Sequence, residues 1–417
     1  MKLKNNISRS GQLVVALVLL ILLASCNYSP QQYYSATKND NIVRIGIIYS
    51  ETGSRSITER SMRDAAAMAV EEINNDGGLL GKQLELVAMD NESKDNLYRG
   101  IVVNLINKYH VKAVFCNIPE GVRTYIESKS KKGQSLIFDL SDYLKKDENS
   151  DIVKLGSSPA QLLYPGVSYL LNNKSNSFTH FFLVGTPDPY SKSANRALKA
   201  YLASNGVHEE NIGERMIETD AEDVSDLIVQ IKRIATSGRA CILNTMTGSA
   251  NLTFFKEFAN QGLSASGCPI MSFTISEDEM RSMGAEFNIG HYFCRNYFQS
   301  MDTDKNIRFV SDFKLFSAIN EFPGGIDRVT GEAIARVYTG VYLWKKAVEK
   351  AGSFEKQVVR DSLPGTQFNS PAGMVQINKR SLTLDKPALV AESDIEGQMT
   401  VLWQSRELIP AFKGIKN

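Results

Sequence analysis

The chain has 417 residues, of which 43% are hydrophobic and 22% are charged, and its formal net charge is +1. This length is enough for two lobes of ordinary domain size, each with its own apolar core. A nearly balanced charge does not indicate nucleic acid or another broadly anionic partner.

The first residues have the organisation of an export signal. Three basic residues among the first nine precede an apolar run over 13–23, which is too short to span a bilayer as a stable helix. The run ends in Leu23-Ala24-Ser25-Cys26, which resembles a bacterial lipobox. The simpler alternative is an ordinary signal peptide that is followed by a cysteine by chance.

We therefore predict a lipoprotein signal peptide over 1–25, lipidation of Cys26, and a polar tether over 26–42. One lipidated terminus would anchor the protein to a membrane surface without spanning it. The expected location is the cell envelope, facing the periplasm or the exterior. Removal of the signal peptide, which carries three positive charges and no acid, changes the formal charge from +1 to −2.

The stretch from Val43 to Asp90 is typical of a βαβ unit. A β-branched run over 43–49 predicts a buried strand, and apolar residues at helical spacing over 58–74 predict a helix. Asp76-Gly77-Gly78 ends that helix, and 84–89 is a second strand. Ligands of such folds bind outside the carboxyl ends of the parallel strands, which here means the loop after Tyr49.

The alternation of strands and helices continues along the chain. Further strands are predicted over 113–116, 136–138, 152–156, 178–184, 240–243, 270–273 and 290–298. Further helices are predicted over 97–108, 119–131, 164–172, 191–204, 223–236, 250–261, 277–283, 307–320 and 332–351. Short strands over 373–377, 388–392 and 399–404 complete the chain. Two successive blocks of this kind predict an α/β fold with two parallel sheets, each covered by helices on both faces.

The sequence offers no support for catalysis. It contains no HxxxH, GxSxG or GxxxxGK[ST] motif, so we predict no catalytic residue, metal site or cofactor. The absence of a CxxC pair argues against a zinc or redox site. Cys116 and Cys241 are expected to be buried thiols, while one disulfide among these two, Cys268 and Cys294 stays open. His291 is interpreted as structural.

Four stretches carry a resemblance to a known family. They are 61–81 (SMRDAAAMAVEEINNDGGLLG), 244–251 (NTMTGSAN), 272–280 (SFTISEDEM) and 290–302 (GHYFCRNYFQSMD). In this order and spacing they look like the solute-binding lipoproteins of ABC importers of the branched-chain amino acid type. The branch they resemble most includes members that bind urea and short-chain amides. The resemblance extends over about residues 43 to 410.

The resemblance implies a type I periplasmic binding protein fold, in which two Rossmann-like lobes are joined by three hinge crossovers. The crossovers would lie near Gly156-Ser157, near Ile289-Gly290 and near Gln367-Phe368. The first lobe would contain residues 43–156 and 290–367, and the second lobe residues 157–289 and 368–417.

The implied function is that of a membrane-tethered substrate-binding component of an ABC importer. Its partners would be a small polar solute, the ABC permease subunits and, through the lipid anchor, a membrane, but no nucleic acid. Two alternatives stay open. The chain is also compatible with a ligand-sensing module for a signalling partner, or with a family member that has lost small-molecule binding.

On the first lobe, the expected ligand contacts lie on the loops that follow strands. Ser50 and Thr52 follow the first strand. After Val114-Phe115 the family has a loop with Ser or Thr before an Arg; Arg123 fits that Arg, and Glu120 stands near the expected serine. After 136–138 the family has Tyr-Pro and a polar residue, where this chain has Asp139-Leu140-Ser141.

On the second lobe, the family has two tyrosines that flank one residue after the strand at 178–184. The first is replaced by Asp188, and Tyr190 fits the second. Ser249 stands where an acidic residue is common, and Thr274 matches the family.

Three carboxylates, those of Glu120, Asp139 and Asp188, are thus expected near a cleft that is neutral in the family. A cationic ligand would explain them, because unpaired charge is disfavoured away from water. Hydrated acids at the rim, a register that is shifted by one residue, and lost binding are the alternatives.

Overall fold

The computed structural model describes residues 40–53, 55–143, 151–172, 178–237 and 239–412. The predicted signal peptide, Cys26 and nearly all of the tether lie outside the described residues. None of the described helices has an apolar run long enough to cross a membrane.

The first sheet is parallel throughout and has the strand order β2-β1-β3-β4-β5. Its strands are β1 (Ile42–Tyr49), β2 (Gln83–Asp90), β3 (Ala113–Cys116), β4 (Leu136–Asp139) and β5 (Val153–Lys154). The near-continuous apolar sequence of the central strands is what burial on both faces requires.

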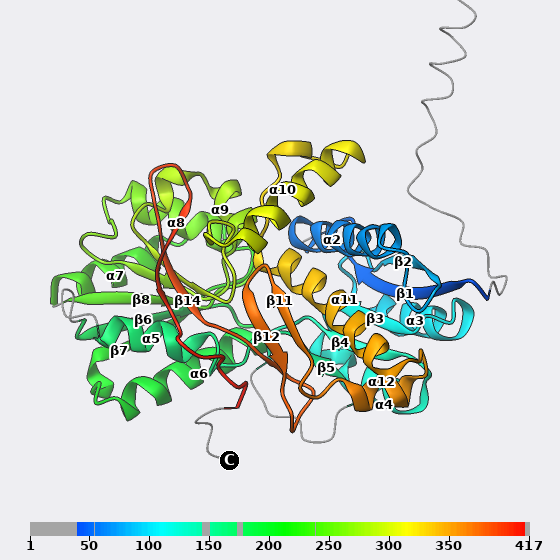
Figure 1. Cartoon of the computed structure of the whole chain (residues 1–417). Coiled ribbons are helices and arrows are strands. Elements are labelled where there is room, and N and C mark those ends of the chain that lie inside the picture. Colours follow the sequence, from blue (N-terminus) through cyan, green and yellow to red (C-terminus); the bar gives the residue numbers. More distant parts are fainter. Residues whose placement is uncertain (1–39, 54, 144–150, 173–177, 238, 413–417) are drawn as a thin grey trace, which may run out of the picture. The chain divides into compact units, whose positions relative to one another are not determined.

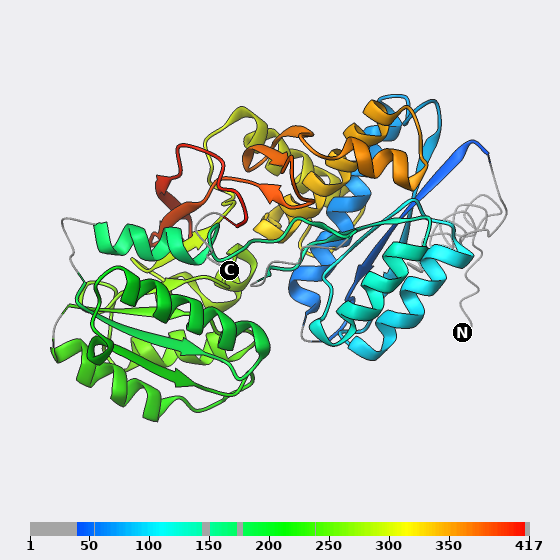
Figure 2. The ribbon, with the colours of Figure 1, turned by 90° about the horizontal axis from the view of Figure 1, so that it is seen from below.

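Helices cover both faces of this sheet. They are α2 (Ser56–Asn75), α3 (Tyr98–Val103), α4 (Arg123–Lys132), α11 (Glu332–Ala351) and α12 (Lys356–Ser362). Figure 2 shows α3 and α4 (cyan) on the side of the sheet opposite to α2 (blue). Helix α11 packs along α2, where the hydroxyls of Tyr338 and Tyr342 both donate to Glu72 Oε2, at 2.7 and 2.5 Å.

The second sheet is mixed, with the order β15-β14-β10-β9-β8-β6-β7. Its strands are β6 (His180–Gly185), β7 (Ile212–Met216), β8 (Ala240–Asn244), β9 (Ile270–Ser272), β10 (Tyr292–Arg295), β14 (Leu389–Ser393) and β15 (Met399–Gln404). The first five run parallel, whereas β14 pairs with β10, and β15 with β14, in antiparallel register.

The two faces of the second sheet have separate apolar cores. Its helices are α5 (Leu163–Asn172), α6 (Pro189–Ser204), α7 (Ser225–Ser237), α8 (Ala250–Asn260) and α9 (Glu277–Met283). Alternate strand residues such as Phe181 and Leu243 pack with α5 and α6, and their neighbours such as Phe182 and Ile242 pack in the core that contains α7 and α8. This period of two along a strand sends successive side chains to opposite faces.

The remaining elements connect or extend these layers. They are α10 (Asp304–Ile319), the strands β11 (Gln367–Ser370), β12 (Gly373–Ile377) and β13 (Leu384–Asp385), the 3₁₀ turns η1 (Asp95–Leu97), η3 (Glu120–Val122), η4 (Glu209–Asn211), η5 (Ala285–Phe287) and η6 (Gly325–Asp327), and the π-helical turn η2 (Asn104–Lys108). The strands β11–β13 form an antiparallel third sheet. A single parallel bridge between Lys154 and Thr383 places its end beside β5.

Two of the expected crossovers differ from the observed path. Strand β10 pairs with β9, with Tyr292 opposite Met271, so the chain is still in the second sheet where the sequence predicted its return to the first lobe. The physical reason is that β9, α9 and β10 form one more βαβ unit, which adds its second strand next to the first. The chain leaves after Arg295 and rejoins the second sheet at Leu389, since β11–β13 form a sheet of their own.

Most elements lie where the sequence predicts them, but β7, α12, β11 and β13 were not predicted. Strand β7 has the sequence IGERM at the edge of its sheet, and its residues are half-buried or exposed. An edge strand of this kind lacks the apolar run that identifies a central strand.

The first crossover generates a stability prediction. A Cβ atom on Gly156 would lie 1.8 Å from the Ser141 carbonyl oxygen, whereas a Cβ on Gly100, within α3, would have no atom within 4 Å. We expect Gly156→Ala to lower the free energy of unfolding by about 3 kcal/mol or more, because backbone must move. Gly100→Ala should be neutral or stabilise by up to about 1 kcal/mol. Urea unfolding of both variants checks this, and equal effects would contradict the close approach at Gly156.

Candidate ligand site

The predicted contacts lie at or after the carboxyl ends of parallel strands in the first and second sheets, where ligands of such sheets bind. The structure shows that most of these side chains already have partners within the chain. Ser50 is buried, and its Oγ lies 2.6 Å from both Glu59 Oε2 and Asn91 Oδ1. Both atoms are acceptors for the Ser50 hydroxyl, and burial raises the pKa of Glu59. Thr52 is exposed, and its carbonyl accepts from Ser93 Oγ.

Two of the three predicted carboxylates on these loops share one arginine. Asp139 is fully buried, and its Oδ2 lies 2.8 Å from Arg123 Nη1. Its other oxygen accepts hydrogen bonds from the backbone and hydroxyl of Ser141. Glu120 is exposed and lies 3.0 Å from Arg123 Nε. Arg123, which the sequence did match to the family, thus neutralises these acids.

The third carboxylate caps a helix. Asp188 Oδ1 accepts from the backbone N–H groups of Tyr190 and Ser191, at 2.8 and 3.0 Å, and so satisfies the start of α6. Its Oδ2 accepts from Thr186 Oγ1 and, at 3.0 Å, from Thr247 Oγ1. All three carboxylates that suggested a cationic ligand are therefore bound by donors of the chain itself.

The remaining predicted contacts differ in their surroundings. Ser249 is exposed at the start of α8, and Thr274 Oγ1 donates to the Met246 carbonyl at 2.6 Å. Tyr190 is different, because its hydroxyl is buried and has no hydrogen-bond partner among the described residues. A buried hydroxyl without a partner is unfavourable, and a ligand atom would relieve this cost.

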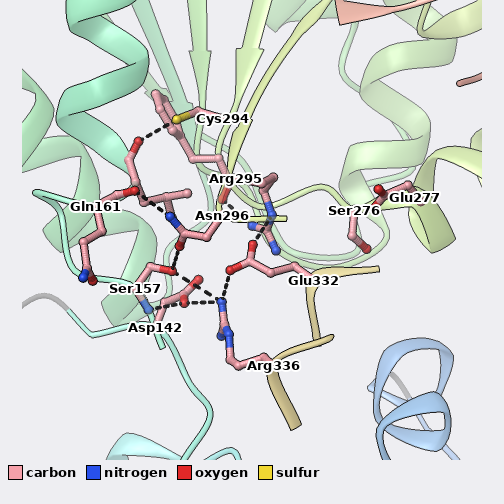
Figure 3. Close-up of polar contacts among 12 residues, drawn as sticks. Asp142, Ser157, Gln161, Ser276, Glu277, Cys294, Arg295, Asn296, Glu332 and Arg336 are labelled. Carbon is pink, nitrogen blue, oxygen red and sulfur yellow. Dashed lines mark hydrogen bonds and ion pairs between the residues drawn. The ribbon is translucent and has the colours of Figure 1, made fainter. Parts of the chain in front are cut away.

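A group of buried charges, which the sequence analysis missed, lies beside these loops (Figure 3). Arg295, at the end of β10, has its Nε 2.8 Å from Glu332 Oε2 at the start of α11. Arg336, one turn further along α11, has its Nη2 2.5 Å from Glu332 Oε1 and 2.9 Å from Asp142 Oδ1. Although burial opposes ionisation, the two guanidinium groups hold the pKa of Glu332 well below its ordinary value.

Lys386 adds a further cation to this group. It is buried, and its Nζ donates to the Leu155 carbonyl at 2.8 Å and to Ser157 Oγ at 3.1 Å. Burial, together with the charge of Arg336, lowers the pKa of Lys386 to about 7. We call Asp142, Arg295, Glu332, Arg336 and Lys386 the junction cluster.

The junction cluster lies where the three connections between the sheets meet. Ser157 Oγ, from the first connection, donates to Asn296 Oδ1 of the second at 2.6 Å. Asn296 Nδ2 then donates to the carbonyls of Gln161 and Pro387, at 3.0 and 2.7 Å. Hydrogen bonds therefore tie all three connections to one another.

Tyr143 belongs to the same surroundings as Tyr190. It follows Asp142 on the loop after β4, and its buried hydroxyl also lacks a partner within the described part of the chain. Burial raises the pKa of both tyrosines, and nearby carboxylates add to this to a smaller extent: Asp139, Asp142 and Asp385 act on Tyr143, and Asp142 acts on Tyr190. Arg295, Glu332 and Arg336 also act electrostatically on Tyr190. One hydroxyl from each sheet thus lies within the field of the cluster.

Two cavities adjoin these elements. One of about 30 Å³, enough for a single water, is lined by Asn296, Glu332, Arg336 and Lys386 among others. The other, of about 470 Å³, lies between the N-terminal part of α2, helix α9 and the segment 323–329. Its arginines have partners: Arg328, for example, lies 2.5 Å from Asp64 Oδ2 and 2.6 Å from Ser61 Oγ.

Helix α9 is tied to the second connection, and the remaining candidate groups are structural. Glu277 Oε1 accepts from the Gln299 backbone at 2.7 Å, and Ser276 forms a capping box with Glu279. His291 Nδ1 accepts from the Ile270 N–H, and burial lowers its pKa to about 3. The four described cysteines are buried free thiols. Across the described ranges, no three His, Cys, Asp or Glu side chains are grouped as metal ligands.

Comparison with known proteins assigns the family. A model described as a periplasmic binding protein domain matches residues 43–413. The chain belongs to the periplasmic binding protein family.

Two solved structures illustrate the shared type I fold. A solute-binding protein of an ABC transporter from Rhodopseudomonas palustris HaA2, in complex with p-hydroxybenzoic acid, has a TM-score of 0.76 at 19% identity, over 90% of this chain and 100% of that one.

The second structure is a branched-chain amino acid transporter substrate-binding protein from Streptococcus pneumoniae in complex with isoleucine. Its TM-score is 0.71 at 17% identity, over 88% of this chain and 100% of that one. Among curated proteins, limonene hydroxylase from Geobacillus stearothermophilus is 29% identical over 129 residues. That match covers 31% of this chain and only 22% of the hydroxylase.

The unpartnered hydroxyl of Tyr190 generates the next prediction. Tyr190→Phe removes only that hydroxyl, so the free energy of unfolding should stay the same or rise by about 1 kcal/mol. The matched control is Tyr338→Phe, which removes a hydrogen bond to Glu72 and should lower the free energy of unfolding by about 2 kcal/mol. Denaturant unfolding measures both variants. A clear loss of stability in Tyr190→Phe would show that its hydroxyl has a partner in the free protein.

Proposed function

We propose that the protein is the substrate-binding component of an ABC importer and that it holds a small polar solute between its first and second sheets. The observation that carries this proposal is the pair of buried, partnerless hydroxyls of Tyr143 and Tyr190. Tyr143 follows β4 of the first sheet, Tyr190 lies in the first turn of α6 after β6 of the second sheet, and charges of the junction cluster act on both. A ligand that accepts from both would hold the two loops together and exclude water.

The proposed ligand contacts are therefore revised. Tyr190 is kept, and Tyr143 is added together with Arg336 of the junction cluster. Ser50, Asp139, Asp188 and Thr274 are assigned to the support of their loops, because each is bound within the chain. Because the three acids have partners, the proposal does not include a cationic solute.

The permease could recognise the bound protein if the solute has different affinities for an open and a closed form of it. A solute that contacts both sheets binds the closed arrangement more tightly, and it shifts the population toward that arrangement. The relatives with solved structures bind p-hydroxybenzoic acid and isoleucine, and the sequence resembles a branch that binds urea and short amides. These compounds define the first candidates.

A thermal-shift screen tests the proposal. The panel contains 4-hydroxybenzoate, 3,4-dihydroxybenzoate, isoleucine, leucine, urea, acetamide, propionamide and putrescine. A ligand present at about 100 times its Kd should stabilise the protein by about 2.7 kcal/mol and raise its Tm accordingly. If no compound raises the Tm, the proposal is contradicted in favour of a chain that has lost small-molecule binding, which the internal partners of Asp139 and Asp188 would then explain.

We also propose that a lipid on Cys26 tethers the protein to a membrane, on the strength of the lipobox-like Leu23-Ala24-Ser25-Cys26. Cys26→Ala should move the protein from the membrane fraction to the soluble fraction of the cell envelope and remove lipid from its N-terminus, as detected by mass spectrometry. Cys116→Ala is the matched control, since that thiol is buried in β3. Retention of Cys26→Ala in the membrane fraction would contradict the lipid anchor.

A further inference from the structure

The junction cluster carries more positive than negative charge. It contains the two carboxylates of Asp142 and Glu332, the two guanidinium groups of Arg295 and Arg336, and the ammonium group of Lys386. Lys386 donates only to a carbonyl and a hydroxyl, and no ion pair found among the described residues includes it. With Lys386 protonated, the cluster therefore has one positive charge in excess.

The side-chain atoms without a hydrogen-bond partner at this site are mostly donors, which agrees with its excess of positive charge. The hydroxyls of Tyr143 and Tyr190 and the Nε atoms of Arg336 and Arg295 are buried donors without a hydrogen-bond partner in the described part of the chain. On the acceptor side, Glu332 Oε2 makes no hydrogen bond, although it lies 2.8 Å from Arg295 Nε, whereas Glu332 Oε1 accepts from Arg336 and Asp142 Oδ1 accepts from the Ser157 N–H. Among the side chains of this site, donors without a partner therefore outnumber acceptors without a partner.

We infer that the solute is an anion and that its carboxylate group is received by the tyrosine hydroxyls and the guanidinium side of the junction cluster. This inference rests on the proposed function and specifies the chemistry of its ligand. A carboxylate supplies two acceptor oxygens and the missing charge together, and hydrogen bonds of this charge-assisted kind are stronger than those between neutral groups. A neutral amide of the same shape supplies one acceptor and no charge.

The excess charge on Lys386 makes binding dependent on pH. Its neighbours in the cluster are Arg336 and Glu332 on α11, Asp142 after β4 and Arg295 on β10, and burial together with Arg336 lowers the pKa of Lys386 to about 7. A bound anion favours the protonated ammonium, so it raises that pKa and draws in a proton. Affinity for the anion should consequently fall as pH rises above 7, by up to about tenfold per pH unit.

Matched pairs of compounds test the inference. The affinities of 4-hydroxybenzoate and propionate are compared by calorimetry with those of 4-hydroxybenzamide and propionamide. We expect the carboxylate in the pair that binds to be favoured by at least tenfold. An amide that binds as tightly as its carboxylate would overturn the anion but leave the proposed receptor intact. Failure of all four compounds and of the wider panel would overturn the receptor as well.

Variants assign the effect to these residues. Tyr190→Phe should weaken binding of the favoured carboxylate by about tenfold while the protein stays folded by circular dichroism. Calorimetry at pH 7.5 in buffers of different ionisation enthalpy should detect proton uptake on binding, and Lys386→Met should abolish it. Lys345→Met, on the outer part of α11, is the control and should change neither quantity.

The same experiment distinguishes Lys386 from other groups whose pKa lies near neutral. Burial raises the pKa of Glu277 to about 8 and that of Asp278 to about 7, so Glu277→Gln and Asp278→Asn are measured beside Lys386→Met. Proton uptake that persists in Lys386→Met but disappears in either acid variant would overturn the role of Lys386. If Lys386→Met does not fold, the unmodified protein is used instead, and absence of proton uptake on binding would overturn the role of Lys386.

Discussion

The contact between Glu332 and its two arginines is the interaction on which the rest of the site depends. Glu332 begins α11, which packs on the first sheet, and Arg295 ends β10 of the second sheet. One buried carboxylate therefore connects a helix of one layer to a strand of the other. Removal of one partner of such a pair typically costs about 3–5 kcal/mol, because the remaining charge is left buried. The cost of an unpaired charge keeps Arg336 in position to bind Asp142 and keeps the loop after β4 in place.

Much of the fold could be predicted from the sequence, since the signals involved are local. Apolar runs give the central strands, and residues at helical spacing give α2 and α11. The path between the sheets could not be placed, because the pairing of β10 with β9 depends on which neighbour the strand finds and not on its own residues. The same limit applies to β7, an edge strand whose half-exposed residues resemble a loop in sequence.

The site was harder to predict for a related reason. The loops that carry Asp139, Asp188 and Tyr190 were identified correctly as strand ends, but the state of each carboxylate depends on its partners. Arg123 lies 16 residues from Asp139 in sequence, and nothing in the local pattern shows that the two pair. Arg336 and Lys386 lie in a helix and in a connecting segment, where a basic residue is ordinarily a solvated surface residue. Only their burial in the folded chain indicates a role, and on this basis we propose a ligand of the opposite charge to the one suggested by the acids.

The fold and the family define a binding protein, and we propose that the junction cluster determines which ligand it binds. The central claim is that the ligand supplies the acceptor and the negative charge that this cluster lacks. The most direct measurement is a crystal structure of the protein with the carboxylate of highest affinity. The account predicts that its carboxylate accepts from Tyr190 Oη and lies beside the guanidinium group of Arg336. A ligand bound between the sheets with its carboxylate in solvent, or held away from the junction cluster, would contradict it.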